Sequence, residues 1–205
     1  INYLADTTAA QADGLVDVSF RIGSVAKTAN VSKETNMALA ATLLSTGKTS
    51  EVASTELKNM YLALRAGESA TKSQESAYKS LGLSAVEVNK GMVKNSDETL
   101  VKVLERLKQL PEEARASTIK QLFGKEAIDS VSTMVNQLDL VKENMQKSQD
   151  KMKQQDSVNK EYANRMNTLS NQLKKAFTRV MNVGSDLGKS LAPSIRDILG
   201  QIEPM

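Results

Sequence analysis

The chain has 205 residues, with 27 Lys and Arg against 24 Asp and Glu, and it contains neither histidine nor cysteine. These counts exclude disulfides, thiol nucleophiles and zinc sites built from cysteine or histidine. Aromatic residues make up only 3% of the chain, which favours the thin core of a helical bundle over a thick β-sandwich. Three prolines and ten glycines supply little of the turn punctuation that an all-β fold requires.

The sequence predicts an all-α fold, in which several short helices over about residues 8–130 are followed by one long, coiled-coil-like helix over about residues 125–183. The expected parts are, in chain order, an N-terminal helix (1–30), a helical hairpin region (31–124), a long heptad-patterned helix (125–183) and a short amphipathic C-terminal segment that we expect to be truncated (184–205).

The N-terminal part carries apolar residues at the three- and four-residue steps of a helix face, including Leu15, Val18 and Ile22. Asn30 is a plausible end for this helix. In the hairpin region, Ser32 is a good N-cap for a helix that reaches about Ser45, and Ser50 or Thr49 starts the next one.

Residues 68–80 are polar and rich in serine and lysine. They predict either a short exposed helix or a partly ordered connection, and they form a candidate binding surface.

The following residues carry dense helix-boundary signals. Ser84 and Glu87 have the spacing of a capping box, in which each side chain satisfies a backbone N–H at the start of a helix. We expect Gly91 to break that helix and Ser96 to cap the next one. Pro111 suits the first turn of the helix after that.

Residues 131–181 contain no proline and no glycine, and apolar side chains recur along them with the 4-3 spacing of a heptad. Ser148, Gln155 and Asn159 interrupt the pattern in its middle, where polar side chains set register at a cost in stability. We expect copies of the chain to associate through this seam. The apolar seam residues are Leu138, Val141, Met145, Met152, Tyr162, Met166, Leu169, Leu173 and Val180.

The sequence contains no phosphate-binding glycine loop and no metal-ligand spacing. The acidic pairs Asp97/Glu98 and Glu112/Glu113 start helices, where carboxylates interact favourably with the helix dipole. We therefore assign no catalytic, cofactor-binding or metal-binding residue, and we expect neither an enzyme, nor a cofactor, nor a small-molecule substrate. No run approaches the roughly 18 apolar residues of a membrane span. No aromatic residues alternate with basic ones, as nucleic-acid binding by base stacking requires, and we expect no sequence-specific nucleic-acid partner.

Three stretches of the chain, with their order and spacing, carry a resemblance to a known protein family. They are ALAATLLSTGKTSEVASTELKNMYLALRAG from Ala38 to Gly67, SLGLSAVEVN from Ser80 to Asn89, and LVKVLERLKQLPEEARASTIKQLFGKEAIDSVSTMV from Leu100 to Val135. With them, about residues 10–143 resemble the core region of bacteriophage tail tape-measure proteins.

The resemblance implies a virion structural protein of a phage or prophage. Such a protein occupies the lumen of the tail tube, sets tail length during assembly in the host cytoplasm, and acts as three or six copies beside tail-tube and assembly proteins. One alternative is a helical binding module that docks a tail assembly chaperone or a tube protein. A cell-wall hydrolase is the least favoured alternative, because no spacing singles out a catalytic pair.

Overall fold

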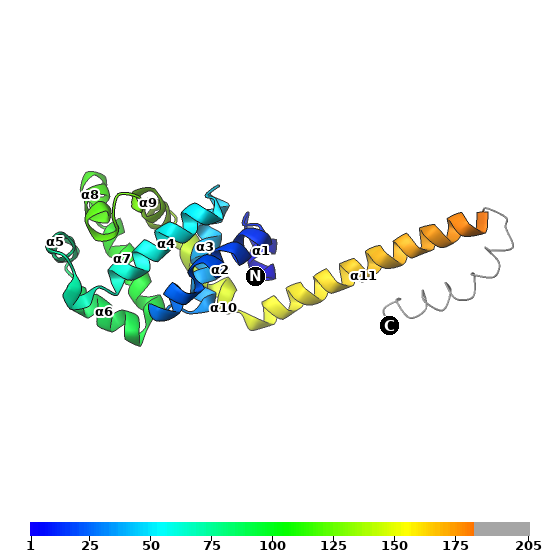
Figure 1. Cartoon of the computed structure of the whole chain (residues 1–205), viewed down its shortest axis with the longest axis horizontal. Coiled ribbons are helices and arrows are strands. Elements are labelled where there is room, and N and C mark those ends of the chain that lie inside the picture. Colours follow the sequence, from blue (N-terminus) through cyan, green and yellow to red (C-terminus); the bar gives the residue numbers. More distant parts are fainter. Residues whose placement is uncertain (183–205) are drawn as a thin grey trace. The chain divides into compact units, whose positions relative to one another are not determined.

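The computed structural model describes residues 1–182, which contain helices and connections and no strand, so the predicted all-α class is confirmed (Figure 1). Residues Ile1–Gln154 form one compact unit, and a second unit begins at Gln155. The C-terminal segment expected at 184–205 lies outside the described residues. The helices are α1 (Asn2–Thr7), α2 (Ala12–Thr28), α3 (Lys33–Ser45), α4 (Ser50–Leu64), the 3-10 helix η1 (Gly67–Ser69), α5 (Lys72–Ser80), α6 (Ala85–Lys94), α7 (Ser96–Lys108), α8 (Glu112–Phe123), α9 (Ile128–Asn136), α10 (Leu138–Gln149) and α11 (Lys151–Asn182).

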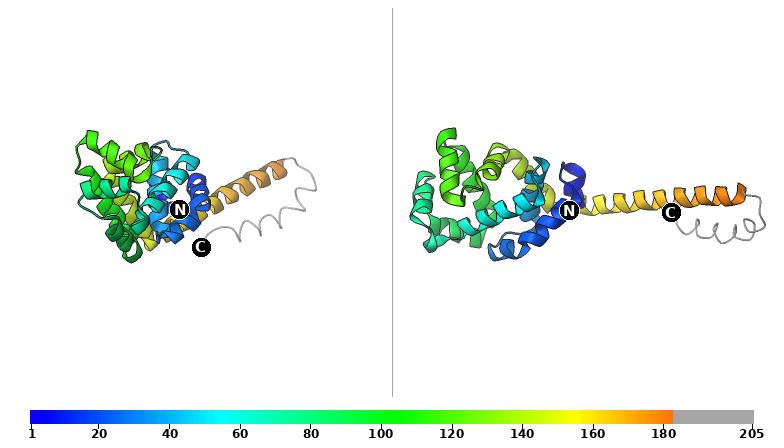
Figure 2. Two further views of the ribbon diagram at one scale, coloured as in Figure 1. Left: turned by 60° about the vertical axis from the view of Figure 1, so that its left-hand side comes forward. Right: turned by 45° about the horizontal axis from the view of Figure 1, so that its top comes forward.

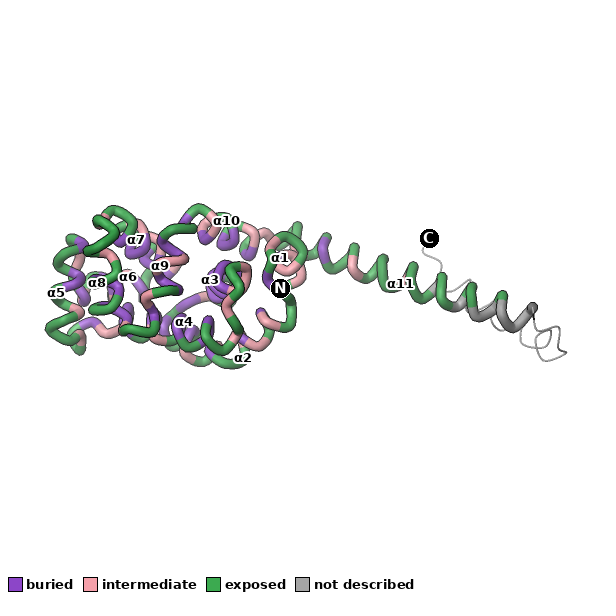
Figure 3. The backbone as a smooth tube through the Cα atoms, turned by 90° about the horizontal axis from the view of Figure 1, so that it is seen from above, coloured by how far each residue is buried: buried purple, intermediate pink, exposed green. Residues whose placement is uncertain are grey.

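Helix α3 is the centre of the compact unit. Its residues 35–43 are all buried, and it packs against α2, α4, α9 and α10. Figure 3 shows this burial, and the two turned views show the helices around α3 gathered into one bundle (Figure 2). The small side chains of Ala38, Ala40 and Ala41 let neighbouring helices approach closely. Residues 35–43 span more than two helical turns, so their burial means that neighbouring helices enclose α3 on every side.

Side-chain caps start the central helices where the sequence predicts them. The Ser32 side chain accepts a hydrogen bond from the backbone N–H of Thr35, and the Thr49 side chain accepts one from Val52. The predicted N-terminal helix is instead two helices, α1 and α2, because the backbone is extended at Thr8, where α1 ends. Asn30 lies just beyond α2 with a left-handed φ of 62°.

Two details of the α6–α7 boundary differ from the prediction. The N-cap of α7 is Asn95, whose side chain accepts a hydrogen bond from the backbone N–H of Glu98, and Ser96 is the first helical residue. Gly91 lies inside α6 instead of ending it. A Cβ atom at position 91 would lie 2.6 Å from Oγ1 of Thr99, so glycine permits the close approach of α6 and α7.

Buried phenols connect α4 to its neighbours. The Tyr61 hydroxyl donates a hydrogen bond to Oδ1 of Asn36 in α3 at 2.9 Å, and the Tyr78 hydroxyl of α5 donates one to the carbonyl of Ala63 at 3.2 Å. Burial raises the pKa of both phenols above the ordinary value for tyrosine. Both hydroxyls therefore keep the protons that these hydrogen bonds require.

Among the elements of residues 1–182, the long helix is confirmed as the last and the longest, but it begins at Lys151 and not near residue 125. The backbone leaves the helical conformation at Gln137 and again at Asp150. These two breaks divide residues 128–182 into α9, α10 and α11. Helix α10 packs against α3 in the compact unit, a partner that a heptad pattern alone does not identify.

A buried carboxylate joins α4 to α9. Glu56 lies in the interior and accepts a hydrogen bond from the hydroxyl of Ser130, while Lys48 pairs with Asp129 beside them. Burial is the main cause that raises the pKa of the Glu56 carboxyl above its ordinary value of 4.5, and Asp129 adds to this rise while Lys48 opposes it.

Replacing Glu56 with glutamine should raise the melting temperature of the compact unit near pH 7. The folded chain holds the Glu56 proton more tightly than the unfolded chain does. The stability that this tighter proton binding contributes is complete below the ordinary pKa of the Glu56 carboxyl. It is lost as the pH rises through the pKa of Glu56 in the folded chain. The gain from Glu56→Gln should therefore vanish near pH 4, as circular dichroism melts would show. The exposed control Glu68→Gln should change little at either pH, and an equal gain at both pH values for Glu56→Gln would refute the assignment.

Candidate interaction site

The structure divides the predicted seam between the two units. Leu138, Val141 and Met145 are buried in α10, whose partner in the compact unit is α3. These three residues are core residues of the single chain, and their predicted place in a self-association seam stays a prediction. Ser148, a polar seam position, is also buried there.

The remaining seam residues belong to α11. Met152 is 79% exposed, Tyr162 is 66% exposed and Leu169 is 44% exposed, and Figure 3 shows exposure over most of the described turns of this helix. Met166 is half-buried. The side chains of Leu173 and Val180 lie outside the described part of the chain.

The exposed face of α11 has the layout of a coiled-coil strand. Met152 and Met166 take one core position of the heptad, and Tyr162 and Leu169 take the other. Asn159 is a single polar residue at a core position, where such a residue fixes the register between helices. Arg165 and Glu161, four residues apart along the helix, form an exposed ion pair at 2.7 Å. An exposed pair of this kind contributes little to stability.

The segment 68–80 belongs to the compact unit and contains the end of η1 and the whole of α5. The Thr71 side chain accepts a hydrogen bond from the backbone N–H of Gln74, and the Gln74 side chain accepts one from the backbone N–H of Thr71, which completes a capping box. Ala77 and Tyr78 are core residues. The sequence interpretation missed this capping box, although Thr71 and Gln74 have the required spacing.

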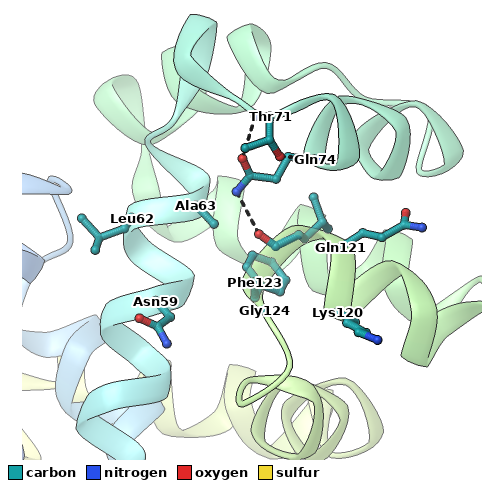
Figure 4. A pocket seen from close by; sticks show the side chains of 10 residues that line it. Asn59, Leu62, Ala63, Thr71, Gln74, Lys120, Gln121, Phe123 and Gly124 are labelled. Atoms are coloured by element: carbon teal, nitrogen blue, oxygen red, sulfur yellow. Dashed lines mark hydrogen bonds between the residues drawn. The ribbon is translucent and has the colours of Figure 1, made fainter.

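A shallow hollow of about 490 Å³ lies between α4, α5 and α8 (Figure 4). Gln74 reaches across it and donates a hydrogen bond to the carbonyl of Leu122 at 3.0 Å. The exposed side chain of Leu62 lines one side, and the buried ring of Phe123 lies at its base. Lys120 is the single charged residue among those that line the hollow, and the other lining residues are polar or apolar, so the hollow offers a surface for contact.

The described residues hold no group of three or more acidic side chains that could bind a metal ion. Within the same part of the chain, no helix is long and apolar enough to cross a membrane.

Comparison with known proteins identifies the family. A family model described as phage-related minor tail protein matches residues 1–124, more than half of the 205 residues. The chain belongs to the phage-related minor tail proteins. The match spans α1 to α8, which belong to the compact unit, and α9, α10 and α11 lie beyond it.

A relative with a more specific name supports this assignment. Over 140 residues, which is 68% of this chain, the sequence is 31% identical to the probable tape measure protein of Halomonas phage phiHAP-1. The aligned region covers 16% of that relative, so this chain spans a small part of its length. No solved structure matches the chain at a significant level. The resemblance to phage tail tape-measure proteins is confirmed, and it places this phage-related minor tail protein among the structural proteins of the virion tail.

Proposed function

We propose that this chain is a segment of a tape measure that runs inside the tail tube and sets tail length through helical self-association. The observation that carries the proposal is α11. Its 32 residues span about 48 Å at about 1.5 Å per residue, and apolar heptad positions stay exposed along it. A rod with an exposed seam suits a protein that must extend along an axis beside copies of itself.

The polar and charged positions of α11 favour parallel, in-register association. Asn159 in one helix meets Asn159 in the next only when the helices run in parallel and in register, and side-chain amides then pair with each other. Lys151 and Asp156 take the flanking positions that face each other between parallel neighbours. Their opposite charges attract in that arrangement.

The assembly that we propose has three or six copies of the chain, with tail-tube and tail assembly proteins as neighbours. It forms in the host cytoplasm and remains in the tail interior of the virion. The chain acts by occupying length and needs neither catalysis nor a cofactor. A docking role toward an assembly chaperone or a tube protein, with 68–80 as its surface, stays a prediction.

Lengthening α11 should lengthen the tail. Duplicating residues 159–172 in the phage gene adds two heptads, preserves the seam and extends a helix by about 21 Å. Because the tube grows in whole rings, we expect the distribution of tail lengths in electron micrographs to shift upward by about this amount. Fourteen Gly and Ser residues inserted at the exposed Gly47 turn are the control, since they add chain without adding rod. Equal tail lengths for the duplication and the parent would rule out the length-setting role of α11.

A further inference from the structure

The seam of α11 continues in phase through α10. Leu138 and Met145 fall on the same heptad position as Met152, and Val141 falls on the same position as Tyr162. No glycine or proline lies between Gly124 and Gly184, so the sequence contains no obligate helix breaker at the α10–α11 junction.

A single residue separates the two helices. Asp150 ends α10 with φ −77° and ψ 88°, and its backbone N–H still donates to the carbonyl of Gln146 at 3.1 Å. Its side chain accepts a hydrogen bond from the backbone N–H of Lys153 at 3.0 Å and so caps α11. That hydrogen bond is the largest cause that keeps the pKa of Asp150 below its ordinary value. A change in the backbone of Asp150 alone would therefore join α10 to α11.

The polar groups of α10 in the compact unit include stabilising contacts and one destabilising feature. Asn144 donates a hydrogen bond to Oγ1 of Thr42 in α3 at 3.0 Å, yet its buried Oδ1 has no hydrogen-bond partner in the described part of the chain. The outer polar contacts include the exposed ion pair of Lys142 with Glu105 at 2.7 Å. Lys147 also donates a hydrogen bond to the carbonyl of Thr7 at 3.2 Å, and Gln149 donates one to Asp97 at 3.0 Å. Exposed pairs of this kind stabilise weakly, and a buried acceptor without a donor destabilises.

We propose that α10 is a convertible segment. In the single chain it packs against α3, and when copies assemble it joins α11 as one continuous helix, so that Leu138, Val141 and Met145 pass from the core of the compact unit to the seam. This inference rests on the proposed self-association. The three side chains cannot contact α3 and a second copy at once, so assembly and the opening of the compact unit are coupled.

The conversion has two consequences. The rod gains residues 138–150, which add about 20 Å of helix. The single chain also withholds the first third of its seam, which limits association before enough copies are present. The preference between the two states follows from differential contacts, because an assembled neighbour binds only the joined form.

A substitution at the α10–α11 junction can disfavour the joined helix without disturbing the state in which α10 packs against α3. Lys151 is the first residue of α11, a position at which proline is favoured. The backbone of Asp150, with ψ 88°, lies outside the α region that is disfavoured before proline. Lys151→Pro should therefore leave the compact unit and α11 intact. In a joined helix the same proline would remove a backbone hydrogen bond and clash with the preceding turn. Lys151→Ala is the matched control.

Spin labels on Glu98→Cys and Gln146→Cys would report where α10 lies, because both positions are exposed and line one groove between α7 and α10. The chain has no other cysteine. Labelled chains are diluted into excess unlabelled chain so that only distances within one chain are measured. We expect one short distance at low concentration and an added, longer distance at concentrations where the chain assembles.

Lys151→Pro should reduce the population with the longer distance by roughly a hundredfold, while assembly through α11 persists. Lys151→Ala loses the same side-chain charge but should keep the longer distance when it assembles, so the difference between the two variants reports the helix junction alone. A chain that assembles and shows only the short distance overturns this inference and leaves the proposed function standing. A chain that stays monomeric at every concentration overturns the proposed function, and this inference with it.

Discussion

Replacing Leu39 with alanine should lower the free energy of unfolding of the compact unit by about 2–5 kcal/mol. Leu39 is 1% exposed in the middle of α3, and helices pack against α3 on every side. Truncating it removes apolar contacts and leaves a cavity that rigid neighbouring helices cannot fill. Urea unfolding followed by tyrosine fluorescence would measure the loss.

Leu62→Ala is the matched control for this prediction. It makes the same chemical change in α4, but Leu62 is 52% exposed, so its replacement should cost less than about 1 kcal/mol. Equal losses for the two variants would mean that α3 is not the centre of the fold. A larger loss for Leu39→Ala would confirm the placement of α3 inside the compact unit.

The double substitution Met166→Asp/Leu169→Asp should weaken self-association by at least about a hundredfold, because burial of each side chain stabilises by about 1.5–3 kcal/mol. Aspartates at core heptad positions would also bring like charges from neighbouring copies together. The melting temperature of the compact unit should not change, since both positions lie in the second unit. Light scattering measures the first effect, and calorimetry measures the second.

Asn167→Asp/Thr168→Asp is the charge-matched control. Both residues are exposed and lie between the two seam positions on the outer side of the heptad. These substitutions add the same two negative charges without touching the seam. If both double variants weaken association equally, net charge accounts for the effect and the seam does not.

The sequence predicts much of the local structure because helix boundaries have local chemical causes. Ser32 and Thr49 cap helices, as predicted, since an N-cap needs only a side-chain oxygen three residues before a free N–H. For α7 the sequence predicts Ser96 as the N-cap, but the N-cap is Asn95. Adjacent residues with similar side chains compete for that role, and the backbone geometry that decides between them is not local information.

The partners of apolar faces are much harder to predict. The heptad pattern identifies the apolar face of α10 correctly, but Leu138 and Val141 have the same periodicity whether their partner is α3 or a second copy. The buried carboxylate of Glu56 was missed for a related reason. Its neighbour Ser130 lies 74 residues away in the sequence, and no residue close to Glu56 in the sequence indicates that contact.

Self-association is the central claim, and sedimentation equilibrium of the intact chain tests it most directly. The account predicts a mass near the single-chain value of 22.3 kDa at low concentration and a reversible rise toward three or more copies as concentration increases. Met166→Asp/Leu169→Asp should abolish the rise, and Asn167→Asp/Thr168→Asp should preserve it. A mass that stays at 22.3 kDa at every concentration would contradict the account.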